Sequence, residues 1–192
     1  MTGLDPKGWV CMHRMHHKHS DTELDPHSPV KKGVWSVLSQ QLHSYNKTLV
    51  GLICEKRKYT SMVKDIPFEV NWLNRNHVWY LPYLVQGLCA GMIGVTCDAW
   101  LLASCYWLGM MSHPIQGWMV NSLGHYFGYR NFDIPDNSRN NHLVSWLVFG
   151  EGYQNNHHFH PKSANFSYRT SELDLGFKVC RALSAIRLLK LI

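Results

Sequence analysis

Two clusters of histidine are the residues of this chain best suited to chemistry. The first contains His13, His16 and His17, and the second contains His157 and His158. If the first cluster is helical, its imidazoles project from one face within a single turn. Imidazole binds iron, zinc, copper and nickel, and two such faces could together enclose one metal ion or a pair. The spacing therefore predicts a metal site where the two clusters meet.

The segments around the first cluster have clear helix and loop signals. Asp5 followed by Pro6 is a good helix start, and this helix is expected to end near Ser20. Residues 21–29 are acidic and contain two prolines, which predicts a loop. Carboxylates in this loop could accept hydrogen bonds from metal-bound imidazoles, or they could simply be solvated. Arg14 is interpreted as a charge that faces solvent or lipid headgroups.

Three further helices are expected from caps and from the spacing of apolar residues. One covers residues 34–53, a second is capped by residues 136–138 and runs to about Phe149, and a third covers residues 172–192. Basic residues accompany the apolar face of the last helix. This pattern is typical of a helix that lies on an anionic membrane surface or binds a partner.

Residues 76–129 contain one formally charged residue, Asp98. Because a membrane-spanning helix needs roughly 20 apolar residues, this block predicts two transmembrane helices that turn near Asp98. A buried helical hairpin in a soluble protein is the alternative. Lysine and arginine flank the block on both sides, so segments 1–75 and 130–192 are both expected in the cytoplasm.

Composition limits the classes of protein to consider. A length of 192 residues suits one domain, and 45% hydrophobic residues exclude a disordered chain. The six cysteines have no paired spacing, so no disulfide framework is expected. The net charge of +6 favours acidic partners and anionic lipids. The basic residues do not alternate with aromatic ones, and no nucleic-acid partner is expected.

The end of the second predicted span carries another candidate ligand. Asn121 and His125 are four residues apart and would share a helical face. Polar side chains that emerge from a membrane helix usually have a function, so His125 is expected to bind metal. His113 is interpreted as a residue that could hydrogen-bond inside the span. Six other histidines are interpreted as surface or supporting residues: His19, His27, His43, His77, His142 and His160.

Taken together, these segments resemble a known family. Residues 9–18 with 20–22 and 25–29 look like the second histidine box of the membrane fatty acid desaturases of the delta-9 acyl-lipid and acyl-CoA type. Residues 120–130 are similar to the segment that ends that family's last span. Residues 150–166 resemble its third histidine box in a glutamine-led form. The segments follow the family's order over nearly the whole chain.

The resemblance implies an all-α integral membrane helical bundle, with a transmembrane hairpin and a cytoplasmic helical cap that holds two non-haem iron ions. The implied activity is an O2-dependent acyl desaturase, which uses two electrons to place a cis double bond, at delta-9, in a membrane lipid or acyl thioester. By this resemblance the iron ligands are His13, His16, His17, His125, His157 and His158, and Asn121 holds a metal through water. Gln154 replaces a histidine of many relatives and could bind iron through its amide oxygen, and Trp118 would line the acyl tunnel.

The family also has an earlier His-x-x-x-x-His box, which this chain does not contain. The chain is therefore expected to be a C-terminal portion of a longer protein, half of a split protein or a truncated product, with substoichiometric iron when alone. A hydroxylase on the same scaffold, a non-catalytic haem or metal-binding membrane protein and an inactive remnant are the alternatives. The electron donor is expected to be a separate ferredoxin-like or cytochrome b5-like protein, because no His-Pro-Gly-Gly is present.

Overall fold

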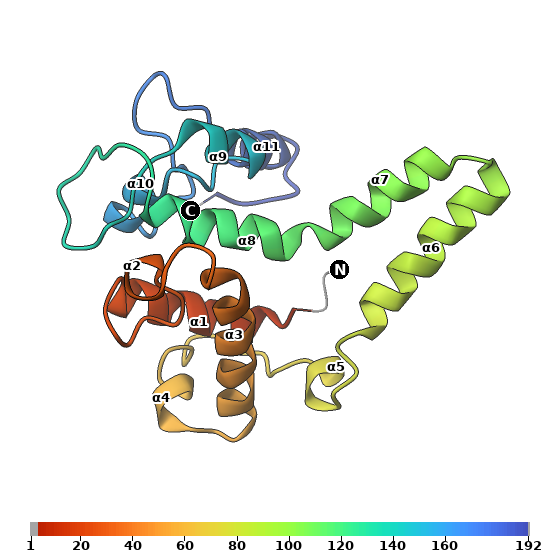
Figure 1. Cartoon of the computed structure of the whole chain (residues 1–192), viewed down its shortest axis with the longest axis horizontal. Coiled ribbons are helices and arrows are strands. Elements are labelled where there is room, and N and C mark those ends of the chain that lie inside the picture. The colour runs from red at the N-terminus through yellow and green to blue at the C-terminus, as the bar shows by residue number, and fades with distance from the viewer. Residues whose placement is uncertain (1–3, 192) are drawn as a thin grey trace. The chain divides into compact units, whose positions relative to one another are not determined.

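The computed structural model describes residues 4–191, and Ile192 at the end of the last predicted helix lies outside them. Within the described residues the secondary structure is helical (Figure 1). The only extended pairing among them consists of isolated bridges that join Tyr129, Asn140 and Tyr153. The expectation of an all-α protein is confirmed for this part of the chain.

The chain divides into two compact units, which are described separately. The first unit consists of residues 1–18 and 40–115, and the second consists of residues 19–39 and 116–192. The first histidine cluster belongs to the first unit, whereas His125, His157 and His158 belong to the second.

The first unit is built around helix α1 (Pro6–His19), whose predicted start is confirmed. Asp5 caps it by accepting a hydrogen bond from the backbone N–H of Gly8 at 2.8 Å. Cys11 and Met15 of α1 pack with Leu49 of α3 (Val37–Ile53) in the main apolar core. Because these apolar residues recur at helical spacing, the opposite face of α1 is left for the histidines.

Arg14 lies at the surface, as interpreted from the sequence, with 40% of its side chain exposed, and it is also anchored there. Its guanidinium donates to the backbone oxygen of Met62 at 2.8 Å and to both carboxylate oxygens of Asp65 at 2.5 and 2.9 Å. The bidentate pair fixes α1 to the loop that follows the short helix α4 (Arg57–Thr60).

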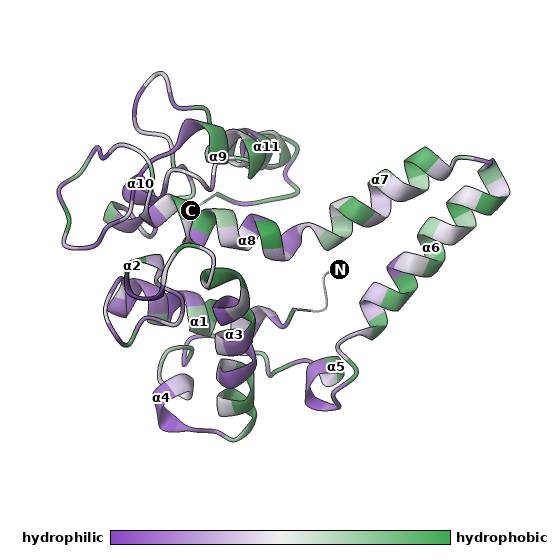
Figure 2. Ribbon diagram, in the orientation of Figure 1, coloured by the Kyte–Doolittle hydropathy of each residue, from purple (hydrophilic) through white to green (hydrophobic). Residues whose placement is uncertain are grey.

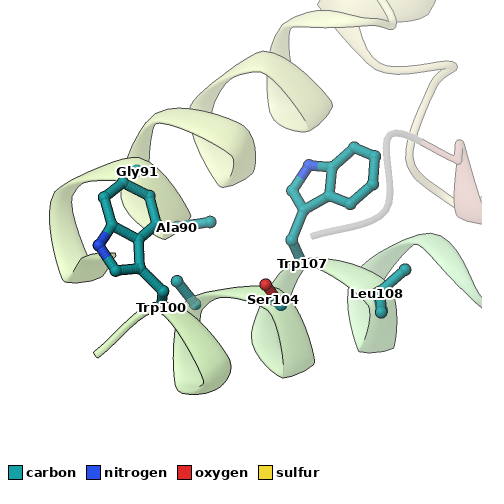
Figure 3. Close-up of a pocket in the computed structure, with 7 residues that line it drawn as sticks. Ala90, Gly91, Trp100, Ser104, Trp107 and Leu108 are labelled. Carbon is teal, nitrogen blue, oxygen red and sulfur yellow. The ribbon is translucent and has the colours of Figure 1, made fainter. Parts of the chain in front are cut away.

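The predicted turn near Asp98 is confirmed. Helix α6 (Leu81–Cys97) and helix α7 (Trp100–Met111) form a hairpin (Figure 1). Asp98 adopts a left-handed conformation between them. Tyr106 donates a hydrogen bond to Gln86 across the pair. A shallow apolar groove between the helices is lined by Ala90, Gly91, Trp100, Ser104, Trp107 and Leu108 (Figure 3). Both helices are rich in hydrophobic residues (Figure 2).

Among residues 4–191, no helix combines the length and the apolar character needed to cross a membrane. The second predicted span is not one continuous helix: α7 ends at Met111, and α8 (His113–Asn121) begins after Ser112. Pro114 explains the break, because proline lacks a backbone N–H and disfavours helical geometry in the residue before it.

Short helices and long loops make up the second unit. These helices are α2 (Pro29–Lys32), η1 (Leu123–His125), α9 (His142–Leu147), α10 (Gln154–Phe159) and α11 (Leu175–Ala185), and α8 leads into η1. The prediction that residues 136–138 cap a helix is wrong. Asn141 caps α9 instead, by accepting from the N–H of Val144 at 3.1 Å. The final helix is shorter than predicted, since it begins after the Asp174 cap and ends at Ala185.

Candidate metal centre

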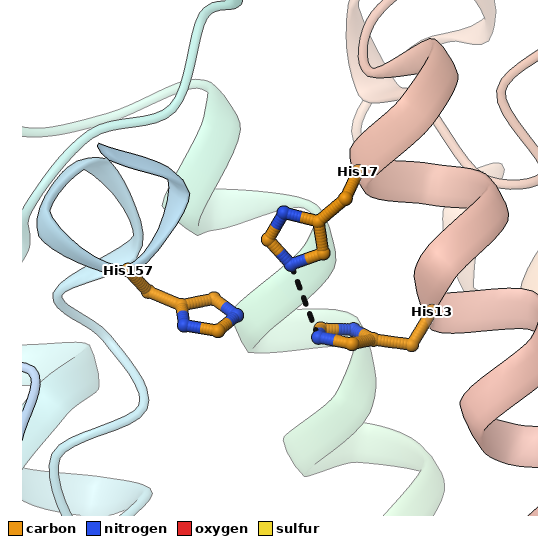
Figure 4. Close-up of side chains that lie close together, drawn as sticks. All are labelled: His13, His17 and His157. Carbon is orange, nitrogen blue, oxygen red and sulfur yellow. Dashed lines mark hydrogen bonds between the residues drawn. The ribbon is translucent and has the colours of Figure 1, made fainter. Parts of the chain in front are cut away.

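Helix α1 presents the first cluster as the sequence predicts. The Nε2 atoms of His13 and His17 lie 3.0 Å apart (Figure 4), and Trp9 stacks on the ring of His13 at 4.9 Å. With metal–nitrogen bonds of about 2.1 Å, a 3.0 Å separation corresponds to two ligands on one ion at about 90°. His16 is buried on the same helix. The helix spacing therefore gives a pair of nitrogens that could bind one metal ion.

The second unit contributes His125, which lies on η1 and is fully buried. Its Nδ1 is 3.1 Å from Oδ2 of Asp21, in the loop that follows α1. Asp21 is itself held by the backbone N–H of Asn137 at 2.7 Å and the hydroxyl of Ser28 at 2.8 Å. Of the two roles left open for the carboxylates of residues 21–29, Asp21 has the contact with an imidazole and is not simply solvated.

His158 has an equivalent partner that the sequence analysis missed. Its Nδ1 is 2.8 Å from Oδ2 of Asp136, whose other oxygen accepts from the N–H and hydroxyl of Ser138. Asp, Asn and Ser at 136–138 are common capping residues, which is why the sequence predicts a helix cap there. The local motif is real, but it holds the carboxylate toward a histidine that is distant in sequence.

The electrostatics favour a neutral His158 beside ionised carboxylates. Burial alone would raise the pKa of Asp21, but its hydrogen bond to His125 and its other donors lower the pKa to about 2. The pKa of Asp136 is likewise held below its usual range by His158 and Ser138 despite burial. Burial lowers the pKa of His158, although Asp136 opposes the shift. A neutral His158 that donates its Nδ1 hydrogen to Asp136 keeps a lone pair on Nε2.

Folding of the second unit brings its candidate histidines close together. The rings of His125 and His158 lie 4.7 Å apart, edge to face, although η1 and α10 are far apart in sequence. His157 lies 5.9 Å from His158 and stacks on Phe166 at 4.3 Å. The ring of His158 is therefore close to both other rings, and Phe166 restricts the orientation of His157.

The other predicted site residues occupy varied positions. Asn121 is the last residue of α8, so the prediction that it shares a helical face with His125 is wrong. Trp118 of α8 donates its indole N–H to the backbone oxygen of Val34 at 2.8 Å. Gln154 is buried at the start of α10, and its amide nitrogen donates to the backbone oxygen of Glu151 at 2.6 Å.

The histidines interpreted as surface or supporting residues occupy both exposed and buried positions. Four are exposed, namely His43, His77, His142 and His160. His27 is buried, because only 1% of its surface is accessible. Its backbone N–H donates to Asp25 at 3.0 Å, so it helps to close the loop that positions Asp21.

The donor set of each unit suits a transition metal that prefers nitrogen ligands. Imidazoles with an Nδ1–H hydrogen-bonded to a carboxylate are a common arrangement at metal sites, since the hydrogen bond fixes the tautomer and raises the basicity of Nε2. Iron, zinc and copper all accept such ligands. The residues therefore fit a histidine-bound metal.

The chain is similar to several characterised proteins. The family model for fatty acid desaturases matches residues 1–184. A hex-5-enoyl-[acyl-carrier protein] acetylenase of Moorena producens is 32% identical over 88% of this chain and 55% of its own length. An acyl-CoA 5-desaturase of Anemone leveillei is 31% identical over 96% of this chain and 54% of its own length. An sn-1 stearoyl-lipid 9-desaturase of Synechocystis is 33% identical over 95% of this chain and 54% of its own length. The chain thus spans about half the length of these relatives. It belongs to the fatty acid desaturase family.

Proposed function

We propose that this protein acts in the O2-dependent desaturation of a saturated acyl chain and introduces a cis double bond at the delta-9 position. Family membership supports this class of reaction, and the relatives include acyl-CoA and stearoyl-lipid desaturases. The observation that carries the proposal is the buried pair of His125 and His158, each with Nδ1 at a carboxylate. The overall reaction would consume one O2, two electrons and two protons, and would release two water molecules.

The proposed cofactor is a pair of non-haem iron ions that supplies the O2 activation needed to remove two hydrogens from the acyl chain. The proposed ligands are His13, His16, His17, His125, His157, His158 and Gln154, with Asn121 holding a water. In this set Asp21 and Asp136 would keep hydrogen on Nδ1 and direct Nε2 toward metal. Gln154 uses its amide nitrogen in the bond to Glu151, which makes its oxygen the atom for a ligand role.

Trp118 is the proposed contact for the acyl chain. It stacks on Trp35 at 4.9 Å, and its indole nitrogen is held by Val34. A side chain fixed at both its face and its polar edge cannot rotate freely. It would therefore present a constant apolar surface to a substrate.

The geometry argues against haem at the His125–His158 pair. Two imidazoles on opposite sides of one iron, with Fe–N bonds of about 2 Å, need ring centroids roughly 6 Å apart. The centroids of these two rings are 4.7 Å apart and the rings meet edge to face. Separate metal ions, or neighbouring positions on one ion, fit this spacing better.

We also propose that residues 76–129 associate with a membrane as a hairpin, with flanking segments 1–75 and 130–192 on the cytoplasmic side. Support comes from the many large apolar side chains that α6 and α7 expose: Leu84, Val85, Leu88, Met92, Val95, Trp100, Leu101, Leu102, Trp107 and Leu108. Water is a poor environment for such a surface, whereas lipid is a good one. The net charge of +6 would favour a separate acidic electron donor of the ferredoxin or cytochrome b5 type.

The test compares His158→Ala with His160→Ala in purified protein. His160 is exposed and only two residues away, so its variant controls for loss of a histidine at the end of α10. We expect His158→Ala to lose iron relative to the parent and His160→Ala to keep it. An alkene formed from a labelled stearoyl substrate, supplied with reductant and O2, would support the proposed reaction. Equal iron in both variants would refute the ligand assignment, and a hydroxylated product without alkene would point to a hydroxylase.

A further inference from the structure

The second unit contains a buried polar network that the proposed chemistry does not use. At its centre is Glu172, which is 7% exposed and lies in the loop before α11. Its Oε1 accepts from the hydroxyl of Tyr129 at 2.6 Å and from the amide of Asn131 at 2.7 Å. Its Oε2 accepts from the amide of Asn156 at 2.8 Å and from two backbone N–H groups of its own loop. The loop contacts explain two of these five donors, and the other three come from distant segments.

Asn156 connects this carboxylate to the histidine helix. Its amide nitrogen donates to Glu172 and to the backbone oxygen of Phe166 at 2.7 Å. Its amide oxygen accepts from Asn131 and from Asn140, both at 2.8 Å. An amide has two hydrogens and two acceptor positions, so every hydrogen-bonding position of Asn156 is used. The residue that directly precedes His157 is therefore fixed in orientation.

Asn155 fixes the same helix to the segment that follows η1. Its side-chain oxygen accepts from the N–H groups of Asn131 and Phe132, both at 2.8 Å, and its nitrogen donates to the oxygen of Phe132 at 3.0 Å. Asn155 has no accessible surface. Segment 129–132 comes a few residues after His125, so these bonds connect the parts of the chain that carry His125 and the α10 histidines.

We propose that Glu172 and Asn156 are positioning residues, which set the α10 histidines relative to His125 before any metal binds. This inference rests on the proposed function, because it assigns the network to a metal site. All four hydrogen-bonding positions of Asn156 are used, and five donors contact the carboxylate of Glu172. A short loop needs fewer hydrogen bonds than this to keep its own conformation. Helix α10 has only six residues and cannot hold its position by helix propensity alone.

The experiment compares Glu172→Gln with Glu23→Gln in the full chain. Glu23 belongs to the same unit, but its side chain is 78% exposed and pairs with Lys31 on the surface. Both variants make the same chemical change. Iron per polypeptide and the visible spectrum of the Co2+-loaded protein report on the metal site, and circular dichroism reports on helix content. Hydrogen exchange of residues 129–132 and 154–159 reports on positioning without any metal.

We expect Glu172→Gln to keep the parent's helix content, to weaken metal binding by about 10–100-fold and to alter the Co2+ spectrum. Exchange should increase in residues 154–159 and 129–132, and Glu23→Gln should match the parent in every measurement. If Glu172→Gln fails to fold, Asn131→Ala makes a smaller change, because it removes one donor each from Glu172 and Asn156.

Unchanged metal binding, spectrum and exchange in the variant would overturn the positioning role while leaving the proposed function intact. Failure of the parent itself to bind iron or Co2+ would count against the proposed function. Hydrogen exchange would then decide the positioning role alone: faster exchange of residues 154–159 supports it, and unchanged exchange overturns it.

Discussion

Gly124 lies beside a proposed ligand, and its replacement by alanine tests how tightly η1 and α10 approach each other. A Cβ atom at this position would be 2.7 Å from Cγ and 3.3 Å from Cβ of Gln154. Carbon atoms in good contact are about 3.5–4.0 Å apart, so the first distance is about 1 Å too short. The Gln154 side chain or α10 must move. Overpacking of this kind typically costs about 1–3 kcal/mol.

The matched control is Gly109→Ala in α7, where no atom lies within 4 Å of the added Cβ. Alanine favours helix over glycine by up to about 1 kcal/mol, so this control should be neutral or stabilising. Urea unfolding in detergent measures the free energy of unfolding of Gly109→Ala and of Gly124→Ala. We expect Gly124→Ala to be destabilised by about 1–3 kcal/mol and also to retain less iron, because His125 and Gln154 both adjoin the contact.

A double variant tests whether the contact with Gln154 causes the loss of stability in Gly124→Ala. Gln154→Ala removes the Cγ atom and leaves the 3.3 Å contact, which a small shift can relieve. In this background Gly124→Ala should cost clearly less than in the parent, so the two changes should be non-additive. The reasoning is refuted if Gly124→Ala is as stable as Gly109→Ala, or if the two effects simply add.

Three further predictions follow from other contacts. The hydrogen bond from Arg14 lowers the pKa of Asp65 to about 2, against about 3.9 in the unfolded chain. Asp65→Asn should therefore reduce the free energy of unfolding at neutral pH, as measured in urea. The difference in stability between the variant and the parent should vanish as the pH falls from 4 to 2. Gly51→Ala would place Cβ 2.2 Å from the ring of Tyr59 and should lower the free energy of unfolding by at least about 1–3 kcal/mol. Asp136→Ala should weaken iron retention by about 10–100-fold, and Asp136→Asn should weaken it less because an acceptor remains.

Local signals in the sequence were sufficient where one segment determines its own structure. The Asp5 cap, the face of α1 that carries His13 and the turn at Asp98 depend on neighbours within a few residues. The histidine boxes also identified the family, because their order covers most of the chain.

The sequence was less informative where two distant segments meet. Residues 136–138 have the composition of a helix cap, but the carboxylate of Asp136 lies 2.8 Å from Nδ1 of a histidine in α10. The break at Ser112 was visible in principle, since Pro114 follows it, but apolar composition favoured one continuous helix. Arg14 likewise could not be paired with Asp65 from spacing alone.

The two histidine clusters are held in place by different forces. Helix α1 has 14 residues and an apolar face, and it is fixed by the packing of Cys11 and Met15 in a hydrophobic core. Helix α10 has six residues, and the first three, Gln154, Asn155 and Asn156, are buried and polar. Hydrogen bonds are directional, whereas apolar packing tolerates substitutions that conserve volume. Polar substitutions at distant partners should therefore disturb His157 and His158 far more than they disturb His13 and His17.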